Sequence, residues 1–243
     1  MIILQYSRAD DELVNNLRKT FEEFNFETEV HTPSTSSKAV TICTKFFRGN
    51  FTSYGALVIV NLHEKSWNKP VDFSHQYQCR KPRKTSKRNM TETDSIILKY
   101  MYSQQYRPPT LRGKPKIIIS QFHVSESVND TKISFNEGTD VFELGIGPKT
   151  SPIDREPLDV LCETMKSTFT TKHLGEIVHS WLQKITQIQF PPLTSKMRTP
   201  VITTSHLRLY VHSDLDKLLY FWRSKNKKIM DYAEHGKICI ICM

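Results

Sequence analysis

The sequence predicts an α/β sandwich in which helices cover both faces of a mostly parallel sheet. Short apolar runs alternate along the chain with segments whose apolar residues recur at helical spacing, which is typical of parallel strands joined by crossover helices. The runs at 56–60 and 117–119 are continuously apolar, as central strands covered on both faces are. No internal repeat or long linker divides the chain, so we expect one domain.

The elements follow from these patterns in order. Acidic residues at 10–12 suit the start of a helix, where the dipole favours negative charge. The N-terminal half is expected to hold a strand at 1–5, a helix with apolar positions from Leu13 to Phe24, a strand at 26–30, a loop at 33–37, a helix with Val40, Cys43, Phe46 and Phe47 on one face, and the buried strand at 56–60.

The C-terminal half is expected to hold more helices than strands. A helical stripe at 96–101 precedes the buried strand at 117–119 and an inner strand at 141–144. Two helices follow, and the second is amphipathic from Leu174 to Ile188 and ends at Pro191-Pro192. The alternating segment 199–210 predicts a single long strand, and 214–232 predicts a terminal helix.

Composition excludes several protein classes. The 243 residues are 38% hydrophobic and 24% charged, which permits a packed core. No apolar run approaches the roughly 18–20 residues of a membrane span, and the N-terminus does not have the pattern of a secretory signal. Cysteine is sparse and odd in number, at five residues, which argues against a disulfide framework, so we expect a reducing, cytoplasmic setting.

The formal net charge of +9 is concentrated in one place. Six basic residues lie within 80–88, in a stretch that holds a proline and lacks apolar periodicity: Arg80, Lys81, Arg83, Lys84, Lys87 and Arg88. This basic patch has the composition of a nuclear-import signal or of a site for phosphate or acidic proteins, and equally that of a solvated loop. Neither it nor the cluster at 223–228 contains interleaved aromatic residues, which argues against a nucleic-acid module.

Five segments, in this order, resemble the caspase catalytic domain. The first, 11–30, resembles the first helix and second strand of the family, and ALVIVNLHEK at 56–65 resembles the strand that ends in Ser-His-Gly. LRGKPKIIISQFHVSE at 111–126 resembles the stretch that ends in the catalytic Gln-Ala-Cys-Arg-Gly. The segments LCETMK at 161–166 and RTPVITTSHLRLY at 198–210 resemble parts of the small subunit. The resemblance implies a caspase-like three-layer sandwich with a six-stranded, mostly parallel central sheet.

The resemblance divides the chain into parts. Residues 1–211 are expected to be a single caspase-like domain, with a large-subunit-like part at about 1–130 and a small-subunit-like part at 140–211. Residues 212–243 are expected to be a C-terminal helical extension and tail. Asp130 and Asp140 flank the segment where caspases are cut between subunits, and we expect an intact chain or cleavage there by an active caspase.

The catalytic motif is not preserved. His63 matches the family's histidine, but His123 stands at the position of the nucleophilic cysteine, 60 residues further on. An imidazole does not readily form the thioester that this chemistry needs. Glu64 replaces the glycine of the oxyanion hole and opposes the negative charge that develops there, and Val124-Ser125 replaces Arg-Gly. The resemblance therefore implies an inactive homologue that needs no cofactor.

Some residues of the substrate pocket have counterparts. Gln121 matches the glutamine that helps to bind the substrate aspartate, and Arg8 and Arg155 are candidates for the two pocket arginines. A metal shared by His63 and His123 would lack a third ligand, so no metal site is expected.

The strand at 199–210 carries the partner prediction. In the family the matching strand pairs at the sheet edge with its counterpart in a second catalytic domain, and an open edge is a template for such pairing. The expected dimer-strand residues are Val201, Thr203, Thr204, Ser205 and His206. We therefore expect a pseudocaspase that pairs with an active caspase or with itself, without a membrane or nucleic-acid partner.

Two alternatives stay open. The first is a caspase-family endopeptidase that cleaves after Asp with a displaced nucleophile, and the second is a binding module built on the basic patch, which would also permit a nuclear location. Cys79, in Gln-Cys-Arg, does not end a buried strand. Cys239 and Cys242 do not stand at the fourth position from the end that prenylation requires, so we expect them in an exposed or edge-packed tail.

Overall fold

A computed structural model describes the helices, the sheet and the shorter connections between them. The described residues are 3–4, 11–62, 97, 99–101, 106–121, 140–146, 156–169, 171–186, 196–198, 202–203, 208–215, 218–221 and 236–242.

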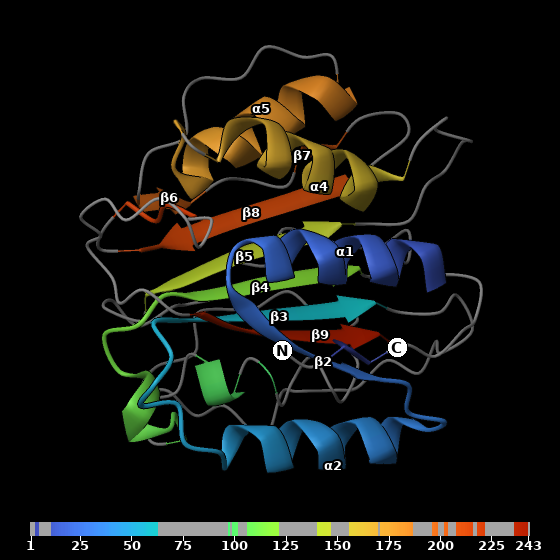
Figure 1. The fold of residues 1–243 in the computed structure, drawn as a ribbon, viewed down its shortest axis with the longest axis vertical. Coiled ribbons are helices and arrows are strands. Elements are labelled where there is room, and N and C mark those ends of the chain that lie inside the picture. The colour runs from blue at the N-terminus through green and yellow to red at the C-terminus, as the bar shows by residue number, and fades with distance from the viewer. Residues whose placement is uncertain are drawn as a thin grey trace, which may run out of the picture.

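The described strands form one sheet of nine strands, with the order β1-β2-β9-β3-β4-β5-β8-β6 and with β7 paired to β8 (Figure 1). Their bounds are β1 Ile3–Leu4, β2 Phe26–His31, β3 Ala56–Leu62, β4 Lys116–Gln121, β5 Val141–Ile146, β6 Lys196–Arg198, β7 Ile202–Thr203, β8 Arg208–Asp214 and β9 Gly236–Cys242. All pairings from β1 to β5 are parallel, whereas β8 is antiparallel to β5, β6 and β7. The sheet is mostly parallel, as predicted, but it has more than six strands.

Helices lie on both faces of the sheet. Their bounds are α1 Asp11–Glu23, α2 Ser36–Phe47, α4 Pro157–Thr168 and α5 Leu174–Thr186, with a 3₁₀ turn η2 at Pro109–Leu111, and Ile97 and Lys99–Met101 are also helical. Thr35 caps α2, because its hydroxyl accepts a hydrogen bond from the Lys38 N–H. Asn25, at a φ of 62°, turns the chain from α1 into β2.

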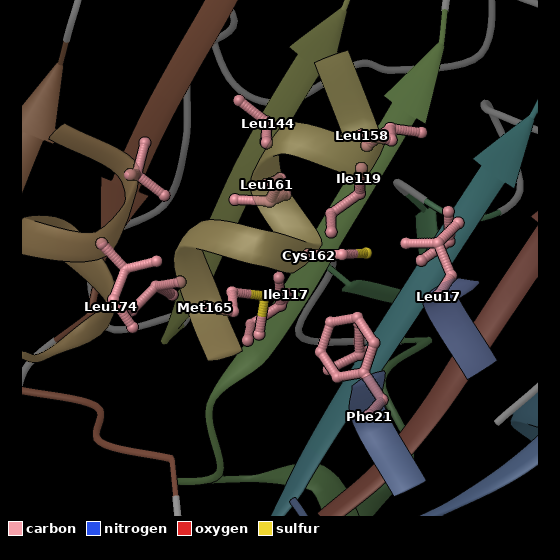
Figure 2. Close-up of a cluster of buried hydrophobic side chains, with 14 of the residues drawn as sticks. Leu17, Phe21, Ile117, Ile119, Leu144, Leu158, Leu161, Cys162, Met165 and Leu174 are labelled. Carbon is pink, nitrogen blue, oxygen red and sulfur yellow. The ribbon is translucent and has the colours of Figure 1, made fainter. Parts of the chain in front are cut away.

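Alternate residues of the central strands belong to two separate hydrophobic cores, because successive side chains of a strand point to opposite faces of the sheet. On one face, Val58, Ile119 and Leu144 belong to a core shared with α1, α4 and α5, which Figure 2 shows in part. On the other face, Leu57 and Ile118 pack with α2 and with the helical residues around Ile97. All of β3 and β5 is buried, which explains the continuous apolar run at 56–60 in β3.

The link between α1 and α4 is polar as well as apolar. The Asn16 side-chain amide donates to the Asp159 carboxylate at 2.8 Å, and Lys166 Nζ donates to Asn16 Oδ1 at 3.4 Å. In α5, the fully buried Trp181 donates its ring N–H to the Pro157 carbonyl at the start of α4. These contacts fix the three helices on one face of the sheet.

The single long strand predicted at 199–210 is wrong. β7 and β8 are two strands of a hairpin, with Ile202 opposite Leu209 and Thr203 opposite Arg208. A hairpin preserves the alternation of side chains across its turn, so periodicity alone did not separate one strand from two. The polar residues at 204–206 are of the kind that favours a turn.

The prediction for the C-terminal extension is also wrong in two respects. Asp214 is the last residue of β8, and residues 215 and 218–221 are not helical; the rest of the predicted helix, 222–232, lies outside the described residues. The last residues do not form a tail, because Gly236–Cys242 is β9, a parallel strand between β2 and β3. Its apolar run Ile238–Ile241 is the signal of a buried strand that the tail interpretation left out.

Candidate functional site

The candidate site lies where three neighbouring parallel strands end. β3, β4 and β5 end at Leu62, Gln121 and Ile146, and their register places these ends at the same edge of the sheet. Open α/β sheets bind ligands outside the carboxyl ends of their strands. In the sequence, His63 follows β3 directly and His123 comes two residues after β4, and both histidines lie outside the described residues.

A row of polar residues and glycine crosses the sheet just before that edge. Asn61, Ser120, Gly145 and Tyr210 are register partners across β3, β4, β5 and β8. Asn61 is fully buried, although the rest of β3 is apolar. No motif or periodicity in the sequence singles these residues out, and a lone amide near the end of an apolar run was the available signal.

Two rows further in, the sheet contains a buried acid. Glu143, which is 4% exposed, stands opposite Ile118 of β4 and His212 of β8. A carboxylate is expensive to bury unless it is paired. Glu143 was also missed by the sequence analysis, although an acid inside the run Val141–Ile146 marks the position.

The start of β4 is tied to the start of β3. Lys114 Nζ donates to the Phe51 carbonyl at 2.6 Å and to the Thr52 carbonyl at 3.1 Å, and burial lowers the pKa of its ammonium. The Leu57 N–H donates to the Pro115 carbonyl at 3.0 Å. These bonds hold the two strands in register, and they thereby set how far each one reaches towards the site.

A second lysine holds the loop before β4 from inside. Lys116 is fully buried, and its ammonium donates to the carbonyls of Leu111 and Lys114. Its backbone N–H donates to the Asp140 carbonyl at 2.8 Å. Asp140 has a φ of 52° and is 6% exposed, so the residue before β5 is held in a left-handed conformation within the structure.

The two cysteines whose surroundings are described are not suited to be nucleophiles. Burial raises the pKa of the Cys162 thiol to about 12, although a hydrogen bond with the Thr20 side chain and the charge of Lys166 act in the opposite direction. Figure 2 shows Cys162 among Leu17, Ile119 and Leu158. Cys43, a residue of α2, is fully buried. Since the thiolate is the reactive form, neither residue fits a displaced catalytic cysteine.

Most of the predicted site residues fall outside the described part of the chain. Gln121 is the last residue of β4, opposite Ile146, and Thr203 lies in β7. Outside it are Arg8, His63, His123, Arg155, Val201, Thr204, Ser205, His206, Asp130, Cys79 and the basic patch Arg80, Lys81, Arg83, Lys84, Lys87 and Arg88.

Two further properties were searched within the described residues. No three of their His, Cys, Asp or Glu side chains lie close enough together to hold a metal ion. None of their helices has both the length and the apolar character needed to cross a bilayer.

Comparison with known proteins gives a structural match only. No protein-family model and no curated protein matches the sequence. The crystal structure of drICE, a caspase, matches with a TM-score of 0.51 and 12% sequence identity, over 91% of this chain and 91% of that one. The chain has a caspase-like fold. At this level of identity the match concerns architecture alone, and it confirms the caspase-like sandwich with a mostly parallel sheet that the sequence predicts.

Proposed function

We propose that this chain is a catalytically inactive caspase homologue that regulates an active caspase by pairing with it along a sheet edge. The observation that carries the proposal is the identity of the residue two positions after β4 in a caspase-like fold. Where the resemblance places the nucleophilic cysteine, the sequence has His123.

Several further features support inactivity. The residue after His63 is Glu64, whose carboxylate would oppose an oxyanion, and Val124-Ser125 replaces the Arg-Gly of the motif. The buried thiols of Cys43 and Cys162 give no replacement. A base without a nucleophile performs no peptide hydrolysis of this kind, so the site would bind a peptide without cleaving it or would be vestigial.

The described edge of the sheet supports the pairing. β8 is covered on its outer side by β6 and β7, and β6 ends the order of described strands. An outer strand presents N–H and C=O groups that a strand of a partner can bind. The pairing surface is therefore proposed on β6 and β7, rather than on one continuous strand at 199–210.

The catalytic part is tested with the purified chain and fluorogenic peptides that contain Asp. We expect no turnover above buffer, whereas an active caspase assayed in parallel releases the fluorophore. Turnover that is lost when a cysteine is replaced by alanine would sink the inactive assignment.

The regulatory part is tested by mixing the chain with purified active caspases. We expect at least one caspase to co-elute with it and to change its rate of peptide cleavage, and the sign of that change defines an inhibitor or an activator. Failure of every caspase to bind or to respond would contradict the regulatory function and leave inactivity as a separate result.

A further inference from the structure

The outermost strand at the β6–β7 edge of the sheet carries two positive charges. β6 consists of Lys196, Met197 and Arg198, and residues two apart in a strand belong to the same face of the sheet. On its inner side β6 pairs with β8, whereas no described strand pairs with its outer side. A strand that joins this edge from outside therefore meets two cations on one face and Met197 on the other.

The inner side of β6 shows which residues match these cations. Lys196 stands opposite Asp214 of β8, so a cation faces an acid there. Arg198 stands opposite His212, and the same row continues to the buried Glu143 of β5. Opposite charges that face each other across a strand pair stabilise a sheet, and like charges destabilise it. The same rule applies to a strand on the outer side.

The edge is divided into two halves by a shift of register. Arg198 and Ile202 are four residues apart in the sequence, but their partners on β8, His212 and Leu209, are only three apart. A difference of one residue between paired strands bends the edge and increases its twist. A straight partner strand therefore pairs with one half, and β6 is the half that carries the charge.

Two copies of this chain are poorly matched for pairing through β6. A two-fold axis perpendicular to the sheet makes the two β6 strands antiparallel and places equivalent residues at equal distances from the axis. With the axis at Met197, Lys196 of each copy stands opposite Arg198 of the other. With the axis at Lys196 or at Arg198, that cation stands opposite its own counterpart. Every one of these registers sets like charges against each other, which is how exposed edges resist self-association.

We propose that β6 selects a partner strand with acidic residues at two alternate positions, and that its charges exclude a second copy of this chain. One acid stands opposite Lys196, the other opposite Arg198, and an uncharged residue between them stands opposite Met197. In an added strand the backbone hydrogen bonds supply affinity, and the alternate side chains supply specificity. The inference rests on the pairing edge of the proposed function, and it adds the chemistry of the partner.

The charge rule is tested without a caspase by pairing two versions of the full chain. Both carry Met197→Cys, and one also carries Lys196→Glu and Arg198→Glu, which gives it the proposed acidic pattern. Equal amounts are mixed and oxidised, and the disulfide peptides that join position 197 of two chains are weighed by mass spectrometry. At low salt we expect peptides that combine the two versions to outnumber the others at least about threefold. In 1 M salt, where the Debye length is about 3 Å, the combined share should fall towards the random value of about half.

Position 41 of α2 provides the matched control. Thr41 is exposed between the exposed Lys38 and Lys45 on the same helix, whose backbone groups are bonded within the helix. Thr41→Cys, with and without Lys38→Glu and Lys45→Glu, should give at least about tenfold less disulfide in the same time, because a helix offers no open edge. A combined share of about half at low salt would overturn the charge rule. Disulfides no more frequent at position 197 than at position 41 would overturn pairing through β6.

A neutral version keeps the test decisive, because Lys196→Glu places an acid opposite Asp214 within the chain. With Met197→Cys, the pair Lys196→Gln and Arg198→Gln removes the repulsion between copies without adding an acid. Oxidised alone at low salt, this version should form more 197–197 disulfide than the version that keeps both cations. An equal or smaller yield would contradict the exclusion of a second copy.

Binding to a caspase separates this inference from the proposed function. For a caspase that binds the parent chain, Lys196→Gln with Arg198→Gln should weaken binding at least about threefold, whereas Lys38→Gln with Lys45→Gln, which changes the net charge equally, should leave it within about twofold. Equal binding by the parent and the β6 variant would contradict selection by charge and leave the proposed function intact. If no caspase binds the parent, the proposed function fails, and the disulfide shares alone decide the charge rule.

Discussion

At the scale of single residues, Cys162 shows how completely solvent is excluded from the face of the sheet that α1, α4 and α5 cover. Its side chain is 1% exposed between α1, α4 and the sheet, and its thiol keeps its proton far into the alkaline range. The neighbouring Asp159 carboxylate adds to this, because it repels a thiolate. The residue is a structural component of the core rather than a reactive group.

The raised pKa of Cys162 predicts a loss of stability in alkali. The native thiol holds its proton up to a pH of about 12, whereas an unfolded cysteine loses it above about 8.5. Between these values the native state binds more protons, so the free energy of unfolding falls as pH rises, by up to about 1.4 kcal/mol per pH unit. Urea unfolding from neutrality to about pH 10 measures this fall.

The control for that experiment is Cys162→Ala, which removes the titrating group. We expect a shallower alkaline slope for this variant, whatever its stability at neutral pH. Equal slopes for the two proteins would contradict the assignment of the effect to Cys162.

The sequence was informative about the site where chemistry depends on residue type in a motif. His63 and His123 were recognisable because they lie beside apolar runs that became β3 and β4. Asn61 and Glu143 were not recognised, since their importance comes from register between strands far apart in sequence. Register depends on tertiary pairing, which a single sequence does not display.

At the scale of elements, the loops that enter β3 and β4 are fastened by the ammonium group of Lys114. Lys114→Met keeps the length of the side chain but removes its bonds to the Phe51 and Thr52 carbonyls. We expect the free energy of unfolding to fall by about 1–3 kcal/mol, as for hydrogen bonds from a charged donor. Chemical denaturation followed by tryptophan fluorescence measures the change.

Lys38→Met is the matched control for Lys114→Met. Lys38 is exposed on α2 and bonds only to the Ser34 hydroxyl among the contacts found for its ammonium. Its replacement should alter stability by no more than about 0.5 kcal/mol. A similar loss of stability in both variants would contradict a specific contribution of the Lys114 hydrogen bonds to the free energy of unfolding.

The conformation of Asp140 predicts resistance to cleavage at this position. A protease needs exposed, pliable backbone, whereas Asp140 is buried, left-handed and bonded through its carbonyl to Lys116. Incubation of the folded protein with an active caspase, followed by mass spectrometry, should yield no fragment that begins at Val141. Asp140→Asn, which tolerates the same backbone conformation, should leave the digestion pattern unchanged. A fragment that starts at Val141 and disappears in this variant would refute the prediction.

Helices and buried strands were predictable from the sequence, because their patterns are local. The apolar periodicities placed α1, α2, α4 and α5 and the strands β2 to β5 close to their observed bounds. The β7–β8 hairpin and β9 were not predicted, because the first shares its alternation with a single strand and the second depends on an edge contributed by β2 and β3. Long-range pairing decided both cases.

At the scale of the whole molecule, the sheet has two different ends. β2 and β1 begin the order of described strands, and β6 with β7 closes it. The end that β6 and β7 form is the edge assigned to the proposed caspase partner.

Proline variants of β6 test the caspase-pairing edge. Adjacent residues of a strand direct their N–H groups to opposite sides, so Met197→Pro and Arg198→Pro differ in whether they remove an outward N–H or one directed at β8. We expect one of them to weaken caspase binding while its melting temperature stays near that of the parent. Met197→Val, which retains the N–H, is the control. Unchanged caspase binding in both proline variants would contradict pairing through β6.

The position of β9 at the end of the sequence also delays completion of the sheet during synthesis. Leu62 ends β3 and Gly236 begins β9, so 174 further residues must be translated before β9 can begin to pair between β2 and β3. At about 5–20 residues per second, this takes roughly 10–35 seconds. During this interval β2 and β3 are not yet joined through β9, so the interior of the parallel sheet is completed only when the last strand has been made.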